Sequence, residues 1–355
     1  HLVQISESVG TPTFHVETVD ELEESVIKRF RTVAVTAGAS TPNWILMEVV
    51  ERLREIEPES TNPLWRWLKC TFRFMIRSNI YVALGSAMLC YANARLMGIS
   101  LGWLPYAISF CYILSVHLIS KVSDKGLLGK SADGAASTSV RRNRVLLRMS
   151  IASAAGALIL AGSQGLAPLG IMLLLIGLGM IYRIEIPGWM LAFGSRKFSL
   201  RLIPASKDLF MALGWSVVTV LFPLFIKDLP LLRPEFFLAF ISTFLLVTVR
   251  SLLFDLRDIQ GDLIVGRETL PTLIGTRNSS ILLYSLTTLQ AVVIAAGTAG
   301  GWLSGFGWVM LPISGYIFGY LYLFQRRILQ GEFPVEFTGD SQFVLSGILA
   351  LIYSL

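Results

Sequence analysis

Long apolar runs, separated by short polar stretches, dominate the chain from residue 78 onward. A helix needs about 20 predominantly apolar residues to cross the hydrocarbon core of a bilayer, which is about 30 Å thick. The runs reach or approach this length, so the pattern predicts an all-α membrane domain. The nine expected transmembrane helices are residues 78–97, 101–121, 146–163, 165–182, 207–226, 235–253, 279–298, 305–325 and 340–355.

The first part of the chain, residues 1–60, has a different pattern, which is typical of a soluble protein. Val16–Phe30 reads as an acidic helix and Thr32–Ala37 as a strand, and a second helix is expected to begin near Pro42. Small residues in the turn before Pro42 leave the N-terminus of that helix open to an anion. We expect a short cytosolic α/β fragment here.

A connecting segment, residues 61–77, alternates aromatic and basic side chains. This pattern is typical of a helix lying along lipid headgroups. A simple cytosolic extension of the first transmembrane helix is the alternative. The expected domains are therefore the soluble fragment 1–60, the interfacial linker helix 61–77 and the transmembrane domain 78–355.

Composition agrees with the apolar pattern: of 355 residues, 54% are hydrophobic and only 15% are charged, and the mean hydropathy is +0.64. The net charge of +6 is concentrated in the loops after the second, fourth, sixth and eighth predicted spans. An excess of Lys and Arg marks cytoplasmic loops. We therefore expect a multi-pass protein of the inner (cytoplasmic) membrane, with a cytoplasmic N-terminus and the lipid bilayer as its solvent.

Several function classes are disfavoured by the residue inventory. The three cysteines are too few and too scattered for a disulfide framework or a metal cluster. The basic residues lie in loops at the membrane edge without interleaved aromatic platforms, so we expect no nucleic acid as a partner.

Three aspartates follow the sixth predicted span: Asp255, Asp258 and Asp262. Spacings of three and four residues place them on one face of a continuing helix at the membrane edge. Magnesium takes oxygen ligands and commonly shares them with substrate phosphates, so the pattern indicates Mg²⁺ with a diphosphate. A solvated acidic cap on a membrane helix is the alternative interpretation.

The segment DLRDIQGDLIVGRETLPTLIG (255–275) resembles the second aspartate-rich motif of the UbiA superfamily of intramembrane prenyltransferases. IPASKDLFMALGW (203–215) is similar to the fifth-helix region of that family, and the resemblance extends over residues 65–355. It implies about nine transmembrane helices around a central cavity. It also implies Mg²⁺ and a prenyl diphosphate substrate, with an aromatic or other lipophilic molecule as the acceptor.

The resemblance also implies roles for individual residues. Asp255, Asp258 and Asp262 would be catalytic and would bind the metal, while Lys207 and Arg267 would face the diphosphate. A further cationic side chain among the acids, that of Arg257, is a third candidate for substrate binding.

One segment departs from the family pattern. Where the family has a first acidic motif of the form NDxxDxxxD, this chain reads HLISKVSDK (His117–Lys125). One alignment register places lysines at two of the acidic positions, and the next leaves only Asp124 as a metal-ligand candidate. Lys121 could neutralise the diphosphate as a phosphate-binding lysine does. It could equally be a positive-inside anchor.

A second resemblance covers His1–Ile56, which is similar to the C-terminal end of 4-hydroxy-3-methylbut-2-enyl diphosphate reductase, an iron-sulfur enzyme. The specific element is TAGASTP (36–42), in which Ser40 would contact the substrate diphosphate. The family's cluster-binding cysteines would all precede His1. We therefore expect either the C-terminal part of a longer fusion, with the iron-sulfur cluster upstream, or a relic.

These observations favour a Mg²⁺-dependent intramembrane prenyltransferase fused to a reductase module. A terpene cyclase of the same superfamily, which needs no acceptor, is one alternative. A non-catalytic membrane anchor for an upstream reductase is another. Release of diphosphate from a prenyl diphosphate distinguishes enzyme from anchor, and its dependence on an acceptor distinguishes transferase from cyclase.

Overall fold

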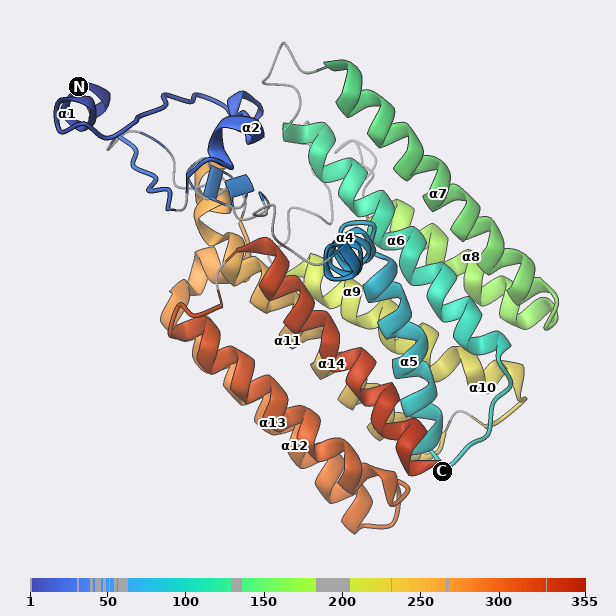
Figure 1. Cartoon of the computed structure of the whole chain (residues 1–355). Helices are drawn as coiled ribbons and strands as arrows, with labels where there is room; N and C mark the ends of the chain where they lie inside the picture. The colour runs from blue at the N-terminus through green and yellow to red at the C-terminus, as the bar shows by residue number, and fades with distance from the viewer. Residues whose placement is uncertain are drawn as a thin grey trace, which may run out of the picture.

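Helices make up the regular structure of this protein, and no strand occurs in the part of the chain that is described (Figure 1). The computed structural model describes residues 2–30, 32–38, 41, 46, 49–50, 52–53, 56, 63–128, 136–182, 205–230, 232–265, 268–329 and 331–355. Three short helical segments lie in the N-terminal fragment: α1 (Leu2–Ser8), η1 (Val19–Glu21) and α2 (Glu24–Ile27).

The remaining helices belong to the linker and the membrane domain. They are α4 (Pro63–Arg77), α5 (Ile80–Leu96), α6 (Leu104–Leu128), α7 (Ala136–Gly162), α8 (Leu166–Ile181), α9 (Ser206–Ser216), the π-helix η5 (Val217–Leu221), α10 (Phe222–Ile226), α11 (Pro234–Val265), α12 (Leu270–Ala299), α13 (Phe306–Gln325) and α14 (Glu332–Tyr353).

The prediction of an all-α membrane domain is confirmed, because every predicted span coincides with helix. Within the described residues, seven helical stretches are long and apolar enough to cross a membrane, with α9, η5 and α10 forming one of them. The α5 helix has 17 residues and α8 has 16, and neither is among the seven. The chain is a multi-pass membrane protein, but the count of nine spans is not confirmed.

Large apolar side chains lie on the outside of the bundle, where a soluble protein would carry polar ones. Ile159 on α7 is 72% exposed and Leu174 on α8 is 60% exposed. On α12, Ile281 and Val292 are exposed as well. Such a surface is stable only against lipid, since contiguous apolar surface in water promotes association. The outer faces of these helices are therefore the lipid-facing surface.

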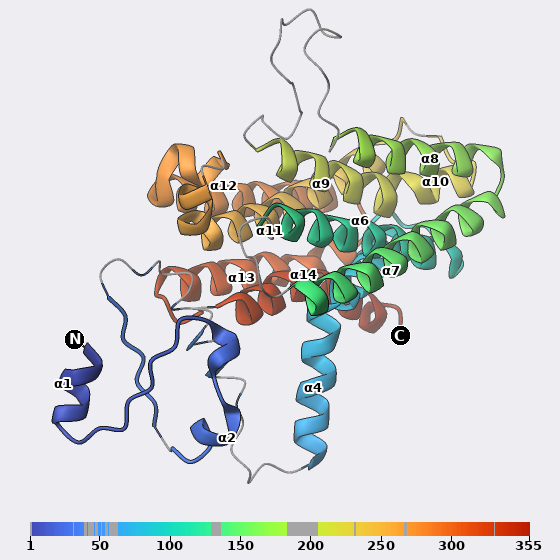
Figure 2. The same ribbon diagram turned by 90° about the horizontal axis from the view of Figure 1, so that it is seen from above.

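The helices that follow one another in the chain pack side by side and form a ring. Contacts run from α5 to α6, from α11 to α12, on to α13 and α14, and from α14 back to α5. The α9 helix packs against α11 (Figures 1 and 2), and η5 is in contact with α5, α6 and α11. The central cavity implied by the UbiA resemblance stays a prediction.

Buried hydrogen bonds join the π-helical segment η5 to its neighbours in the interior of the bundle. The Asn93 side chain donates hydrogen bonds to Thr219 on η5 at 3.2 Å and to Thr243 on α11 at 2.9 Å. All three residues are at most 1% exposed. Buried polar groups are retained when they are hydrogen-bonded, and such a contact holds three helices in one register. The π-helical segment η5, which continues from the C-terminal end of α9, is thereby fixed against α5 and α11.

The α/β character expected for the soluble fragment is not found in its described residues. Residues 32–38 have no regular secondary structure. A strand is stabilised by hydrogen bonds to a neighbouring strand, and no such neighbour occurs in the described part of the fragment. The Thr41 amide does donate to the Gly38 carbonyl at 2.9 Å, which is a turn. The helix expected near Pro42 falls mainly on residues outside the described part.

The acidic helix predicted over Val16–Phe30 is wrong for most of its length, since only η1 and α2 are helical. The Glu17 amide and then the Thr18 hydroxyl donate to the Glu21 carboxylate at 2.9 and 3.0 Å and lower its pKa. These local bonds compete with a regular helix. Repulsion among closely spaced carboxylates opposes the helix further.

The linker helix α4 lies crosswise to the bundle helices and joins the bundle where α5 begins (Figure 2). Its inner face packs through Phe72, whose ring lies 5.5 Å from that of Tyr81 and 5.1 Å from that of Phe337 on α14. Its other face carries Trp67 and Phe74, which are 62% and 61% exposed. A helix placed crosswise with an exposed aromatic face suits a headgroup layer, and lipid contact by α4 stays a prediction.

Candidate functional site

An ion pair between α9 and α11 forms the centre of the candidate site. Lys207 Nζ lies 3.1 Å from Asp255 Oδ1. The Asp255 side chain is 7% exposed and that of Lys207 is 41% exposed, so the carboxylate is buried while the amine reaches toward the surface. The structure thus brings together two residues that the sequence predicted for the same site.

A second carboxylate, Asp208, lies beside this ion pair and was missed by the sequence analysis. It is 3% exposed, and Ser251 on α11 donates a hydrogen bond to its Oδ1. Its other oxygen, Oδ2, is buried without a hydrogen-bond partner among the described residues. Ser251 lies one helical turn before Asp255 on α11, so Asp208 is held beside that second carboxylate. An acid within an apolar helix is a signal that could have identified it.

The other two predicted acids are less enclosed than Asp255. The α11 helix continues to Val265, so Asp258 and Asp262 extend from the same helix. Asp258 is exposed and pairs with the adjacent Arg257, from which two nitrogens donate at 2.7 and 2.8 Å. Asp262 is half-buried. Within the described residues, no three acidic, His or Cys side chains converge as a preformed metal site.

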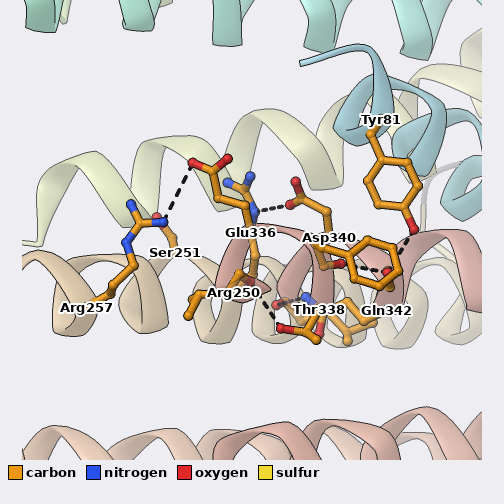
Figure 3. Close-up of polar contacts among 12 residues, drawn as sticks. Tyr81, Arg250, Ser251, Arg257, Glu336, Thr338, Asp340 and Gln342 are labelled. Carbon is orange, nitrogen blue, oxygen red and sulfur yellow. Dashed lines mark hydrogen bonds and ion pairs between the residues drawn. The ribbon is translucent and has the colours of Figure 1, made fainter. Parts of the chain in front are cut away.

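The cationic side chains of α11 face α14 rather than solvent (Figure 3). Arg250 Nε donates to Asp340 Oδ1 at 2.7 Å, and both side chains are less than 9% exposed. Two helical turns further along, Arg257 Nη1 lies 3.6 Å from Glu336 Oε1. The Phe254 ring sits between them, 4.3 Å and 5.2 Å from the two guanidinium carbons. Arg257, predicted to bind substrate, is therefore engaged with two carboxylates.

The end of α6, where the sequence departs from the UbiA pattern, contributes no described carboxylate to the site. His117 is 8% exposed, and its Nε2 has no hydrogen-bond partner within the described part of the chain. Lys121 donates to the Arg77 carbonyl at the end of α4, at 2.8 Å. The side chain of Asp124 lies outside the described residues.

Two further predicted site residues cannot be placed. Arg267, predicted to face the diphosphate, and Ser40, predicted to contact diphosphate in the soluble fragment, both lie outside the described residues. Their assignments stay predictions.

The donor set suits a hard cation. Magnesium prefers oxygen ligands and is held by one or two carboxylates, with substrate phosphates and water completing its coordination. Asp255 and Asp208 are buried carboxylates from neighbouring helices, and one oxygen of Asp208 is unpartnered among the described residues. Asp258 and Asp262 lie further along α11. Lys207 adds a cationic group that can interact with a phosphate.

The geometry is that of an intramembrane helical bundle with acidic and basic side chains gathered at one end. Solved structures of the same fold are UbiA homologues. The bundle matches the apo UbiA homologue from Aeropyrum pernix K1 with a TM-score of 0.55 and 13% identity, over 78% of this chain and 98% of that one.

A UbiA homologue from Archaeoglobus fulgidus, solved with GPP and Mg²⁺, matches with a TM-score of 0.54 and 13% identity, over 78% of this chain and 97% of that one. The same homologue solved with DMAPP and Mg²⁺ matches with a TM-score of 0.54 and 14% identity, over the same shares of the two chains. The membrane domain therefore has the UbiA fold.

The N-terminal fragment has relatives of its own. Residues 1–54 match the family model described as LytB protein. The 4-hydroxy-3-methylbut-2-enyl diphosphate reductase of Clostridioides difficile is 47% identical over 55 residues, and that of Alkaliphilus oremlandii is 48% identical over 44 residues. These alignments cover 16% and 12% of this chain and only 19% and 16% of the two reductases. The chain thus joins the C-terminal end of a reductase sequence to a UbiA-like bundle.

Proposed function

We propose that the membrane domain is a Mg²⁺-dependent prenyltransferase, which transfers a prenyl group from a prenyl diphosphate to an aromatic or other lipophilic acceptor. The observation that carries this proposal is the contact of Lys207 with the buried Asp255 at 3.1 Å, within a bundle of the UbiA fold. The acidic and basic groups match the needs of a metal-bound diphosphate. The apolar side chains of the bundle suit binding of a prenyl chain.

The residues have complementary roles in this proposal. The bond between C1 of the prenyl group and the diphosphate oxygen breaks, and its electron pair leaves with the diphosphate. Mg²⁺, when bound, would supply positive charge that stabilises this leaving group. Asp255 orients Lys207, whose ammonium group is placed to take up diphosphate charge. Buried apolar side chains exclude water from the allylic cation, which the acceptor captures with loss of a proton.

Diphosphate release by the purified full chain in lipid nanodiscs tests this function. With Mg²⁺ and geranyl or dimethylallyl diphosphate, we expect release that requires a lipophilic acceptor and stops when EDTA removes the metal. Release without any acceptor would indicate a terpene cyclase instead. No release from either substrate, in protein that keeps its helical circular dichroism, would contradict enzymatic function.

A non-catalytic membrane anchor is the second candidate, and the end of α6 favours it. Lys121 there is bound to the Arg77 carbonyl at 2.8 Å, and the neighbouring His117 is buried. Neither replaces the acids of the first UbiA motif. In an anchor, the bundle would hold the soluble fragment at the bilayer without turning over a prenyl diphosphate.

We also propose that residues 1–54 end a reductase module whose iron-sulfur part is encoded upstream, and that this module lies on the cytoplasmic side of the inner membrane. The support is the match to LytB protein and the basic loops of the bundle. The coding sequence before His1 tests the fusion. We expect it to encode the rest of the reductase with three separated cysteines, and their absence would leave residues 1–54 as a relic.

A further inference from the structure

Asp208 is a buried carboxylate to which the proposed mechanism gives no role. It follows Lys207 on α9, but the two side chains have different surroundings. Lys207 is partly exposed, whereas Asp208 is 3% exposed and packs against α11. Buried carboxylates are costly unless a partner compensates their charge.

The hydrogen bonds of Asp208 account for only one of its two oxygens. Oδ1 accepts from the Ser251 hydroxyl, while Oδ2 is buried and unpartnered among the described residues. Ser251 lies one helical turn before Asp255 on α11, so the Asp208 side chain is held beside the Asp255 carboxylate, and two like charges so placed repel each other. An unsatisfied buried oxygen of this kind calls for a ligand or ion that completes it. A cation placed between the two carboxylates would satisfy Oδ2 and remove the repulsion.

We propose that Asp208 is a metal ligand, and that it and Asp255 together hold the divalent cation of this site from two different helices. The inference rests on the proposed function and deepens it. Among the described side chains, the end of α6 supplies no carboxylate to the site, whereas α9 would supply one.

Two carboxylates from the protein are sufficient for a magnesium ion. Magnesium keeps several waters and takes further oxygens from substrate phosphates, so a protein need not supply a closed set of ligands. This agrees with the finding that no three potential ligands converge in the described residues. The imidazole of His117 is also buried, with a nitrogen unpartnered in the same part of the chain, but a nitrogen ligand suits softer metals.

The ion pair of Lys207 with Asp255 is consistent with this two-carboxylate site. Its ammonium group lies 3.1 Å from Asp255 Oδ1 and so supplies positive charge beside the two acids. If Asp208 and Asp255 hold a cation, the charge of Lys207 would no longer be needed beside the two acids. Lys207, at the edge of the site, is then positioned to interact with the phosphate oxygens that accompany the metal.

The test measures metal binding directly, independent of turnover. Mn²⁺ serves as the probe, and its binding to the full chain in nanodiscs is titrated by electron paramagnetic resonance, with and without inorganic diphosphate. Asp208→Asn keeps the shape of the side chain and an acceptor for Ser251, but it removes the charge. We expect this variant to weaken Mn²⁺ binding at least about tenfold.

Asp228→Asn is the matched control, because Lys227–Asp228 repeats the Lys-Asp pair in an exposed loop outside the site. We expect it to bind Mn²⁺ as the unchanged protein does. If Asp208→Asn loses its cooperative unfolding, Asp208→Ser replaces it, since the smaller neutral side chain also removes the carboxylate.

The outcomes separate this inference from the proposed function. Unchanged Mn²⁺ affinity in the folded Asp208 variant, together with loss of binding in Asp255→Asn, would overturn the assignment of Asp208 and leave the function intact. Unchanged affinity in both variants would overturn the metal site as a whole. Weaker binding in both, with the Asp228 control unaffected, supports the two-helix site.

Discussion

Asp255→Asn is expected to reduce diphosphate release from geranyl diphosphate by about 10²- to 10³-fold, the loss typical when one strong electrostatic contributor is removed. Asp255 carries the largest expected effect because it is buried and contacts Lys207 at 3.1 Å. The substitution removes a metal ligand and the partner of the lysine at once. Release is measured with Mg²⁺ at saturating prenyl diphosphate.

Two comparison variants make this result specific. Asp258→Asn is expected to cause a smaller loss, because Asp258 is exposed and its charge is already paired with Arg257. Asp228→Asn, in an exposed loop, is expected to leave release unchanged. Activity of Asp255→Asn within about threefold of the unchanged protein would show that this carboxylate does not take part in the reaction.

Asp340→Ala is expected to destabilise the bundle by about 3–5 kcal/mol, the range found when one partner of a buried ion pair is removed. Arg250 donates to Asp340 at 2.7 Å, and its guanidinium also lies over the Phe254 ring. Without Asp340, the positive charge remains in the interior between α11 and α14. The free energy of unfolding is measured in detergent micelles by denaturant titration followed by circular dichroism.

Two further variants test whether the loss of stability comes from the unpaired charge of Arg250 or from lost packing alone. Glu336→Ala is expected to cost about 1 kcal/mol or less, because its contact with Arg257 is 3.6 Å long and nearer the surface. The double variant Arg250→Met with Asp340→Leu is expected to recover much of the stability, since no charge stays unpaired. A double variant as unstable as Asp340→Ala alone would refute this explanation.

The helices could be predicted from the chain because the signal for a membrane span is local. The predicted segment 279–298 lies within α12, and 305–325 coincides with α13 to within one residue. Boundaries were less accurate where polar residues follow an apolar run. The α11 helix continues from the predicted end at residue 253 to Val265, because a helix does not need to end where it leaves the hydrocarbon.

The candidate site was predicted only in part, because its contacts join residues far apart in the chain. Lys207 and Asp255 are 48 positions apart, Asp208 and Ser251 are 43 apart, and Arg250 and Asp340 are 90 apart. The family motifs indicated the first pair. An acid within an apolar helix could have drawn attention to Asp208, but its partners depend on how α9 is rotated against α11.

The partner of Lys121 could not be predicted from the sequence either. Its sequence neighbourhood suggested either a diphosphate contact or an anchor at the membrane edge. In the structure it binds the carbonyl of Arg77, 44 positions earlier. The linker helix α4 ends at that carbonyl, and the last carbonyls of a helix have no partner within it. Its partner thus depends on where α4 meets α6.

Run length, loop charge and short motifs are properties of consecutive residues, so the chain alone was enough to establish an apolar helical protein with an acidic cluster at one end. The pairing of those acids, the burial of Asp208 and the Arg250–Asp340 bond are set by helix rotation and side-chain packing. These depend on burial and satisfied hydrogen bonds across the whole bundle. They can therefore be recognised only when the helices are seen together.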